Sequence, residues 1–368
     1  MLGSQKKPRK PRPAILVLSL ALVVAAFAAM TRSRRSSKSD GLFAQVGYRI
    51  HDLASGVCVA EVAGVPTGNP QLNNNCFVSI PHTSDILCVY GGVLNVVDLI
   101  SGKRRDVTTT GTTYSVAVSH DGDLACAGVK DGRYPHILVL AANEGYMVRR
   151  DILIKEHGYP VSLSISPSKN AIVCAISEST GPPGSMILID VAHGSYRILG
   201  SGENPRFLCD ECFIFESSGR VLSYDIADAA IRVLSSGFNY SLAPDKRHYF
   251  AFLSTEPPVG NIYELSEPYT ERARVVKQGI GAFSRGTNLG AFSPAWSGDS
   301  ERVAFGGDYL STWPVTWSTW PVTWEINSTN EVYVYDLREH VVRRVYKRRA
   351  SSHIAGQDVI LGLCWLQP

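Results

Sequence analysis

The sequence predicts an all-β protein: a β-propeller of about seven four-stranded blades, preceded by one N-terminal transmembrane helix. From residue 44 onwards, short β-branched runs alternate with turns rich in Gly, Asp, Asn and Pro, without an amphipathic helical stretch. A unit of roughly 35–50 residues recurs, which is the length of one four-stranded blade. A chain of 368 residues is long for one compact core, unless repeated units each bury their own layer.

Each unit has two recognisable parts. The first is an apolar strand, a Ser-Pro-like turn and a strand of small residues, at residues 80–90, 118–128, 165–176, 242–252 and 292–305. The second is a third strand that ends on an acidic residue, at Asp52, Asp98, Asp190, Asp225, Glu264 and Asp336, with a degenerate copy at residues 139–145. We expect these carboxylates to accept hydrogen bonds from backbone N–H groups of the following turn, where Gly supplies a positive φ.

The two ends of the repeat region predict how the ring closes. Residues 46–62 contain only the outer strands of the first unit, whereas residues 358–366 (DVILGLCWL) are a lone apolar strand. A propeller removes exposed strand edges when one terminus completes the blade begun by the other. We therefore expect Val359–Trp365 to lie in the same sheet as Tyr48–Leu53.

One unit carries a resemblance to a known family. Residues 293–305 (SPAWSGDSERVAF), followed by residues 331–337 (EVYVYDL), resemble the blade motif of TolB-type, WD-repeat-like propellers. The resemblance is clearest over residues 292–337 and diffuse over residues 44–366. Gly298 stands where the family usually has Pro, and no unit ends in Trp-Asp. The resemblance implies the propeller fold.

The N-terminal region divides into a basic leader (residues 1–13), an apolar segment (14–30) and a flexible basic tether (31–43), before the propeller at 44–368. As a helix, residues 14–30 would span about 26 Å, slightly less than the hydrocarbon core of a bilayer. Three interpretations stay open: a signal anchor, a signal peptide cleaved near Ala26–Ala28, and a buried core helix. The basic cluster Arg32–Arg35 behind the segment favours the anchor.

The distribution of charge bears on partners and location. Nine of the 36 Lys and Arg lie in the first 38 residues, so the remaining chain carries 27 basic and 33 acidic residues. A domain of that sign predicts no nucleic-acid partner. Five basic residues before the apolar segment, against four after it, favour a single-pass membrane protein with an exoplasmic or periplasmic propeller.

A tandem duplication stands out in the last unit. Residues 311–317 and 318–324 both read STWPVTW and place four of the six tryptophans within a short loop: Trp313, Trp317, Trp320 and Trp324. Tryptophans clustered on a loop are typical of partner-binding surfaces. The alternative is an extended hairpin whose tryptophans pack only on one another.

Five of the eight cysteines fall into expected core positions or one CxxC pair. Cys88, Cys126 and Cys174 occupy the same position in three successive units, which indicates packing in the core. Cys209 and Cys212 form a CxxC without nearby zinc ligands, which favours a structural or incidental pair over a metal site. A disulfide or redox pair is the other alternative, and we name the two as a candidate disulfide for an exoplasmic domain. The nine histidines are scattered, and six of them lie in or beside expected turns.

The sequence contains no nucleotide-binding, zinc-protease or serine-hydrolase motif, so we assign no catalytic, cofactor or metal residues. It therefore predicts a non-catalytic interaction module that binds a protein or an envelope component. Two alternatives stay open. A propeller enzyme, such as a lyase or hydrolase, requires three or more His, Asp or Glu side chains in one channel mouth. A membrane-coupled ligand sensor requires an apolar pocket on the axis.

Overall fold

The structure is a computed structural model that divides into two units, residues 1–40 and 41–368. It describes part of the second unit: residues 42–46, 49–55, 57–62, 77–107, 109, 111–132, 134–178, 184–255, 258–267, 269, 272–281, 287–291, 294–314, 324–350 and 360–366. None of the helices in these ranges is both long and apolar enough to cross a bilayer. The apolar segment at residues 14–30 lies outside them, so its assignment to a membrane stays a prediction.

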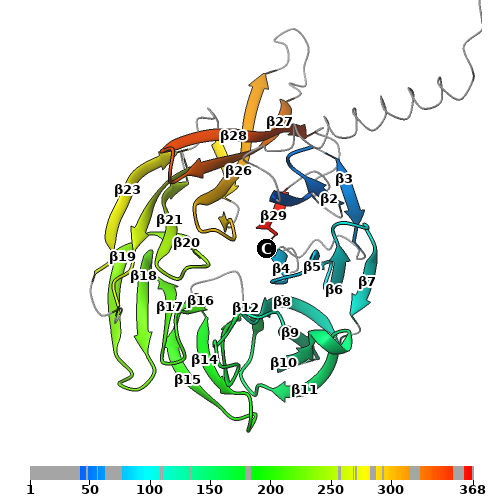
Figure 1. Cartoon of the computed structure of the whole chain (residues 1–368), viewed down its shortest axis with the longest axis vertical. Helices are drawn as coiled ribbons and strands as arrows, with labels where there is room; N and C mark the ends of the chain where they lie inside the picture. Colours follow the sequence, from blue (N-terminus) through cyan, green and yellow to red (C-terminus); the bar gives the residue numbers. More distant parts are fainter. Residues whose placement is uncertain are drawn as a thin grey trace, which may run out of the picture. The chain divides into compact units, whose positions relative to one another are not determined.

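Within the described ranges, strands β1 to β29 form seven antiparallel sheets around one axis, which confirms the predicted propeller (Figure 1). We name the blades A to G in ring order and give the strands of each from the axis outwards. Blade A is β29 (Ile360–Trp365), β1 (Leu42–Val46), β2 (Arg49–Asp52) and β3 (Cys58–Glu61). Blade B is β4 (Phe77–Ser79), β5 (Asp85–Tyr90), β6 (Val93–Asp98) and β7 (Arg104–Val107).

The next three blades follow the same order. Blade C is β8 (Thr112–Val118), β9 (Leu124–Asp131), β10 (Tyr134–Ala141) and β11 (Met147–Leu153), with a short 3₁₀ turn, η2 (Ala142–Glu144), between the last two. Blade D is β12 (Tyr159–Ile165), β13 (Ala171–Ser177), β14 (Ser185–Asp190) and β15 (Tyr196–Ser201). Blade E is β16 (Glu203–Phe207), β17 (Cys212–Ser217), β18 (Arg220–Asp225) and β19 (Ile231–Ser236).

The last two blades complete the ring, and the second of them carries the longest strands. Blade F is β20 (Phe238–Leu242), β21 (His248–Thr255), β22 (Pro258–Glu264) and β23 (Arg274–Gly281). Blade G begins with β24 (Thr287–Ala291) and β25 (Ala295–Trp296), which both pair with β26 (Arg302–Pro314), and continues with β27 (Trp324–Asp336) and β28 (Val341–Ala350).

Burial changes in a regular way across each blade. The second and third strands are buried on both faces, as in β13 (AIVCAIS), because each blade packs between two neighbours. The fourth strands are mostly exposed, as in β15 (YRILGS). Seven hydrophobic cores result, one between each pair of adjacent blades. The predicted core positions of Cys88, Cys126 and Cys174 are confirmed, since all three side chains are fully buried.

The C-terminal strand closes the ring as predicted. β29 pairs antiparallel with β1, from Leu42 opposite Trp365 to Val46 opposite Ile360, in the sheet that also contains β2. Strand β1 begins at Leu42, so Leu42 and Phe43, which the sequence places in the tether, belong to blade A. Both side chains are buried, so β1 is part of the core from its first residue.

The repeated aspartates perform the expected turn chemistry. Each of Asp52, Asp98, Asp190, Asp225 and Asp336 accepts a hydrogen bond from a backbone N–H two or three residues later. Gly102 takes φ 68°, and a Cβ there would meet the carbonyl oxygen of Val59 at 2.6 Å. Two equivalent turns reach the left-handed region without Gly, at Ala229 and His340. Glu264 differs, because its carboxylate instead binds the Arg274 guanidinium.

The Asp98 turn predicts a measurable pH dependence. Hydrogen bonds from Ser101 and Ser84 lower the pKa of Asp98 to about 2. A lowered carboxyl pKa stabilises the fold above the unfolded-state pKa, near about 3.9, and this contribution is lost as the pH falls towards the folded value. Replacing Asp98 with Asn should therefore destabilise the protein at neutral pH, and the difference from wild type should shrink between about pH 4 and pH 2.

Urea denaturation across this pH range measures the difference. Asp228→Asn is the matched control, because no turn hydrogen bond to its carboxylate occurs among the described residues, and only its N–H takes part, donating to Asp225. If the difference in unfolding free energy between wild type and Asp98→Asn did not change with pH, this would contradict the role given to the Asp98 carboxylate.

Candidate functional site: the axial cavity and its rim

The inner ends of all seven blades enclose a cavity of about 290 Å³ on the propeller axis. It is lined by the last residues of the first strands, and each blade contributes at least one residue. The first strands lie at the edge of their sheets, so one row of their backbone groups faces the axis. The ring geometry alone therefore creates this cavity from segments that are far apart in the chain.

Most of the lining residues have apolar side chains, backbone polar groups contribute to the surface between them, and the one charged side chain is Arg206 in β16. Its Nη1 donates to the carbonyl oxygens of Pro205 (2.9 Å) and of Leu163 in blade D (3.1 Å). Aromatic side chains of Trp296 and Trp365 form another part of the wall. Both indole N–H groups are used, since Trp296 donates to the Ser241 carbonyl and Trp365 to the Ala295 carbonyl.

A rim of tight turns joins the first strand to the second in each blade from B to G. In five of these turns a backbone N–H bonds to the carbonyl five residues later, as from Ser119 to Leu124 and from Ser297 to Arg302. The turn of blade E, which carries the CxxC, is one residue shorter and closes between Leu208 and Cys212. Five of the six rim turns therefore share one backbone geometry, and the turn of blade E differs from it.

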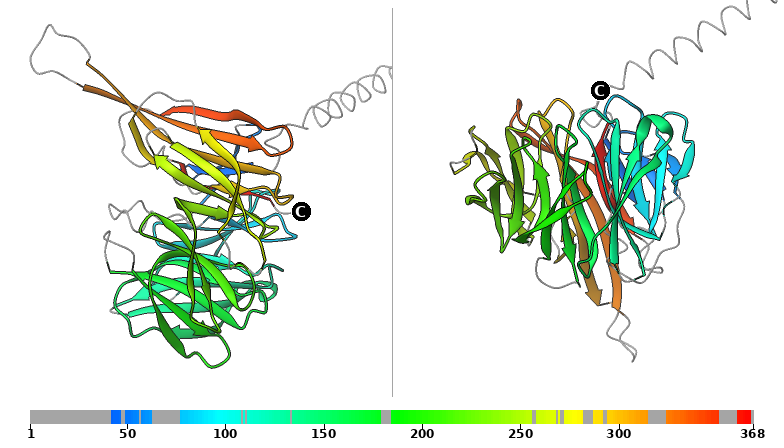
Figure 2. Two further views of the ribbon diagram at one scale, coloured as in Figure 1. Left: turned by 90° about the vertical axis from the view of Figure 1, so that its left-hand side faces the viewer. Right: turned by 90° about the horizontal axis from the view of Figure 1, so that it is seen from below.

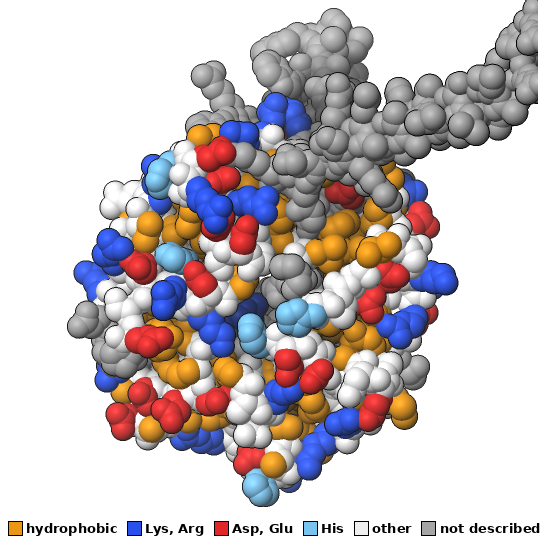
Figure 3. All heavy atoms as spheres, viewed as in Figure 1, with side chains coloured by type: hydrophobic (Ala, Val, Ile, Leu, Met, Phe, Trp, Pro, Cys, Tyr) orange, Lys and Arg blue, Asp and Glu red, His pale blue; other side chains and the backbone are white. Residues whose placement is uncertain are grey.

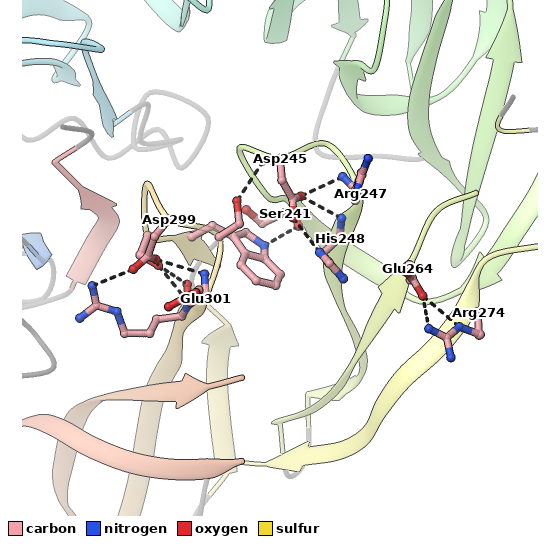
Figure 4. Close-up of polar contacts among 12 residues, drawn as sticks. Ser241, Asp245, Arg247, His248, Glu264, Arg274, Asp299 and Glu301 are labelled. Carbon is pink, nitrogen blue, oxygen red and sulfur yellow. Dashed lines mark hydrogen bonds and ion pairs between the residues drawn. The ribbon is translucent and has the colours of Figure 1, made fainter. Parts of the chain in front are cut away.

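Contacts between neighbouring turns tie the rim together. Lys169 of blade D bonds to Asp121 of blade C, and the Ser168 N–H donates to Asp210 of blade E (2.8 Å). In Figure 4, the Asp245 backbone N–H of blade F donates to the Ser300 hydroxyl of blade G (2.9 Å). Blade G reaches the closing strand through Arg302, whose guanidinium carbon lies 4.8 Å from the Trp365 ring centroid. These contacts hold the cavity end of adjacent blades in fixed positions.

The rim face mixes charges of both signs (Figure 3). Several of its acids are paired locally, as Asp245 is with His248 at 2.8 Å, and this contact raises the pKa of His248. Lys246 is half-buried near Asp210 and Cys209, and its burial lowers the pKa of its ammonium group. The described part of the chain contains no group of three or more His, Cys, Asp or Glu side chains able to hold a metal ion.

The predicted site residues lie in separate places. Trp313 and Trp324 lie in β26 and β27 of blade G, whereas Trp317 and Trp320 lie outside the described residues. Cys209 and Cys212 flank the turn of blade E, and both are free thiols in the structure, so their disulfide stays a prediction. His136, one of the six histidines that the sequence places in or beside expected turns, lies within β10 and pairs with Asp151.

The axial site was not identified from the sequence. In the sequence, Trp296 stands out only as part of the family motif, and Trp365 only as part of the closing strand. Arg206 stands in a strand without any motif around it. One signal in the sequence could have identified Arg206. It is a charged residue near the end of a first strand, where the other units carry apolar or hydroxyl residues.

Comparison with known proteins supports the fold class. No protein-family description matches the chain, and no curated protein matches it in sequence. Among solved structures it is similar to the Myceliophteria thermophila Cps50 (Swd1) β-propeller domain, with a TM-score of 0.55, 10% identity, and coverage of 79% of this chain and 90% of that one. The chain thus has the WD-repeat-like propeller fold.

Two further solved structures are similar at lower scores. TolB from Acinetobacter baumannii has a TM-score of 0.46 and 12% identity, covering 87% of this chain and 78% of its own. An oligogalacturonate lyase in complex with manganese has a TM-score of 0.49 and 12% identity, covering 86% and 81%.

The cysteines provide a direct test of the described packing. Burial raises the pKa of the Cys88, Cys126 and Cys174 thiols, whereas Cys58 is exposed. Alkylation of the reduced native protein should therefore modify Cys58 while these three stay unmodified until denaturant is added. Peptide mass spectrometry measures each site, and native-state labelling of Cys174 would contradict the core. The same experiment without reductant shows whether Cys209 and Cys212 have lost their two thiol hydrogens to a disulfide.

Proposed function

We propose that this chain is a non-catalytic interaction module that is held at a membrane by residues 14–30 and binds a protein or envelope component. The observation that carries the proposal is a two-stranded arm on blade G. Strand β26 pairs with β27 without interruption, from Arg302 opposite Asp336 to Pro314 opposite Trp324. The arm leaves the propeller on the side away from the C-terminal end of β29 (Figure 2).

The arm extends beyond the support of its own sheet. β24 pairs with β26 only as far as Leu310, and β28 pairs with β27 only as far as Ser328. The last four pairs, residues 311–314 with 324–327, therefore have no third strand among the described residues. A two-stranded ribbon is marginally stable in water by itself, so the fold gains little from this extension.

The composition of the arm supports a binding role. Residues 311–324 contain four tryptophans and no charged residue. Uncharged aromatic segments on projecting hairpins are typical of partner-binding surfaces, where Trp contributes much of the binding energy. The rigid ring behind the arm fits this role, because it presents the arm from a fixed position.

Membrane display rests on the sequence of the first 38 residues. An uncharged stretch of 17 residues between two basic clusters favours a retained anchor. The charge balance favours an exoplasmic or periplasmic propeller. Protease treatment of intact membranes tests this placement: protection of the propeller against digestion in sealed right-side-out vesicles would place it in the cytoplasm instead.

Replacing Trp317 and Trp320 with Ser should weaken partner capture by about tenfold or more, since aromatic anchors dominate typical interfaces. Deleting one copy of the duplication, residues 318–324, should have a similar effect. Quantitative crosslinking in the native membrane, followed by purification of the chain, measures captured partner.

Ile198→Ser is the matched control, since Ile198 is 55% exposed on β15 of blade D and lies outside the arm. Unchanged capture by the Ser variants would contradict the binding role. A lowered unfolding midpoint in those variants would show instead that the tryptophans stabilise the hairpin.

A further inference from the structure

The axial cavity is chemically asymmetric. Its one charged group, Arg206, comes from blade E, while Trp296, Trp365 and Phe77 come from the consecutive blades G, A and B. In the ring, blade E lies across the axis from blades A and B (Figure 1). A molecule in the cavity would therefore meet a cation on one side and aromatic carbon on the other.

Arg206 is suited to bind an anion. A guanidinium is always charged and offers its N–H groups in a planar fork that matches a carboxylate. Its two Nη1 bonds to backbone carbonyls fix the side chain, and no hydrogen-bond partner for Nε or Nη2 occurs among the described residues. The buried acid Glu216 lies close enough for its charge to interact with that of Arg206, but no hydrogen bond joins the two side chains. The Glu216 carboxylate is bonded by Asn204 and by the Asn239 and Tyr240 N–H groups.

The opposite wall is suited to an apolar body. The indole N–H groups of Trp296 and Trp365 are already bonded to backbone carbonyls, so the small exposed part of each side chain, 5% and 3%, offers only carbon to a ligand. The Arg302 guanidinium lies over the Trp365 ring, so Trp365 is open to a ligand only on the part that Arg302 leaves uncovered. Phe77 adds an aromatic ring without polar atoms. The lining contains no acidic side chain among its described residues, and its other polar side chains are the hydroxyls of Ser79, Ser164 and Ser241.

We propose that the axial cavity binds a small aromatic carboxylate, with the carboxylate on Arg206 and the ring against Trp296 and Trp365. The volume of about 290 Å³ is near the lower end for small-molecule pockets, so the ligand has the size of a single aromatic ring with a short acidic arm. The sequence leaves open a membrane-coupled ligand sensor with a pocket on the axis, and this inference names the class of ligand that such a sensor would bind. It does not depend on the arm of blade G.

Benzoate, phenylacetate and 3-phenylpropionate, each compared with its neutral amide, are the probes. Calorimetry on the full chain in amphipol should show that at least one acid binds about tenfold or more tightly than its amide, because a hydrogen-bonded ion pair is lost in the amide. Arg206→Gln should remove this preference. Arg220→Gln, which changes an exposed arginine of the same blade, should retain it.

A second variant covers the case in which Arg206→Gln does not fold. Ser241→Phe leaves Arg206 in place but fills the cavity, so it should abolish binding of acid and amide alike at an unchanged unfolding midpoint. No binding of any acid to the wild-type chain, or equal binding of acid and amide, would overturn the proposal. Deletion of residues 318–324 should leave acid binding unchanged, which separates this test from that of the arm.

Discussion

The antiparallel pairing of β29 with β1 joins the two ends of the chain's described part and completes the ring. β29 contributes to two cores at once: Leu363 and Trp365 pack between blades G and A, while Cys364 packs between blades A and B. Without this strand, blade A would expose the edge of β1, and two of the seven cores would lose part of their wall. The other five cores contain no residue of β29.

A closed ring also explains where function can lie. The blades bury their faces against one another, so the sheets vary little in position, and the groups free to differ are those at the axis and in the connections. The rim turns are tied from blade to blade by Lys169, Asp210 and Ser300, which fixes the cavity wall below them. The arm of blade G is the opposite case, because it extends past all such support. The two proposed binding features thus differ in kind. The axial cavity is enclosed by rigid blades, whereas the arm of blade G projects from the propeller.

Local signals in the sequence predicted the fold well. The Asp turns depend on residues within three positions of one another, and the alternation of strands and turns is equally local, so both could be recognised from one chain. Ring closure could be predicted because an unpartnered strand at one end matched a blade lacking its inner strand at the other. The start of β1 at Leu42 was missed, since two apolar residues after a basic, Ser-rich stretch do not make a recognisable strand.

The axial site could not be predicted in the same way. Its wall combines Phe77, Arg206, Trp296 and Trp365, which are separated by up to 288 positions and carry no common motif. Only the order of the blades places Arg206 across the axis from the aromatic wall. At Glu264 the sequence pattern predicts a role that the side chain does not have. Glu264 fits the pattern of a turn acid, but its side chain binds Arg274 in the neighbouring strand. A pattern of residue types thus located the repeated turns, and the packing of distant strands determined the site.

Native-state hydrogen exchange of the full chain tests ring closure most directly. If β29 and β1 complete the ring, their amides should exchange only through global unfolding, with the same free energy as those of the buried central strand β13. Exchange of the β29 amides at a much lower free energy than those of β13 would mean that the C-terminal strand opens independently. The ring would then not depend on it, contrary to the closure described here.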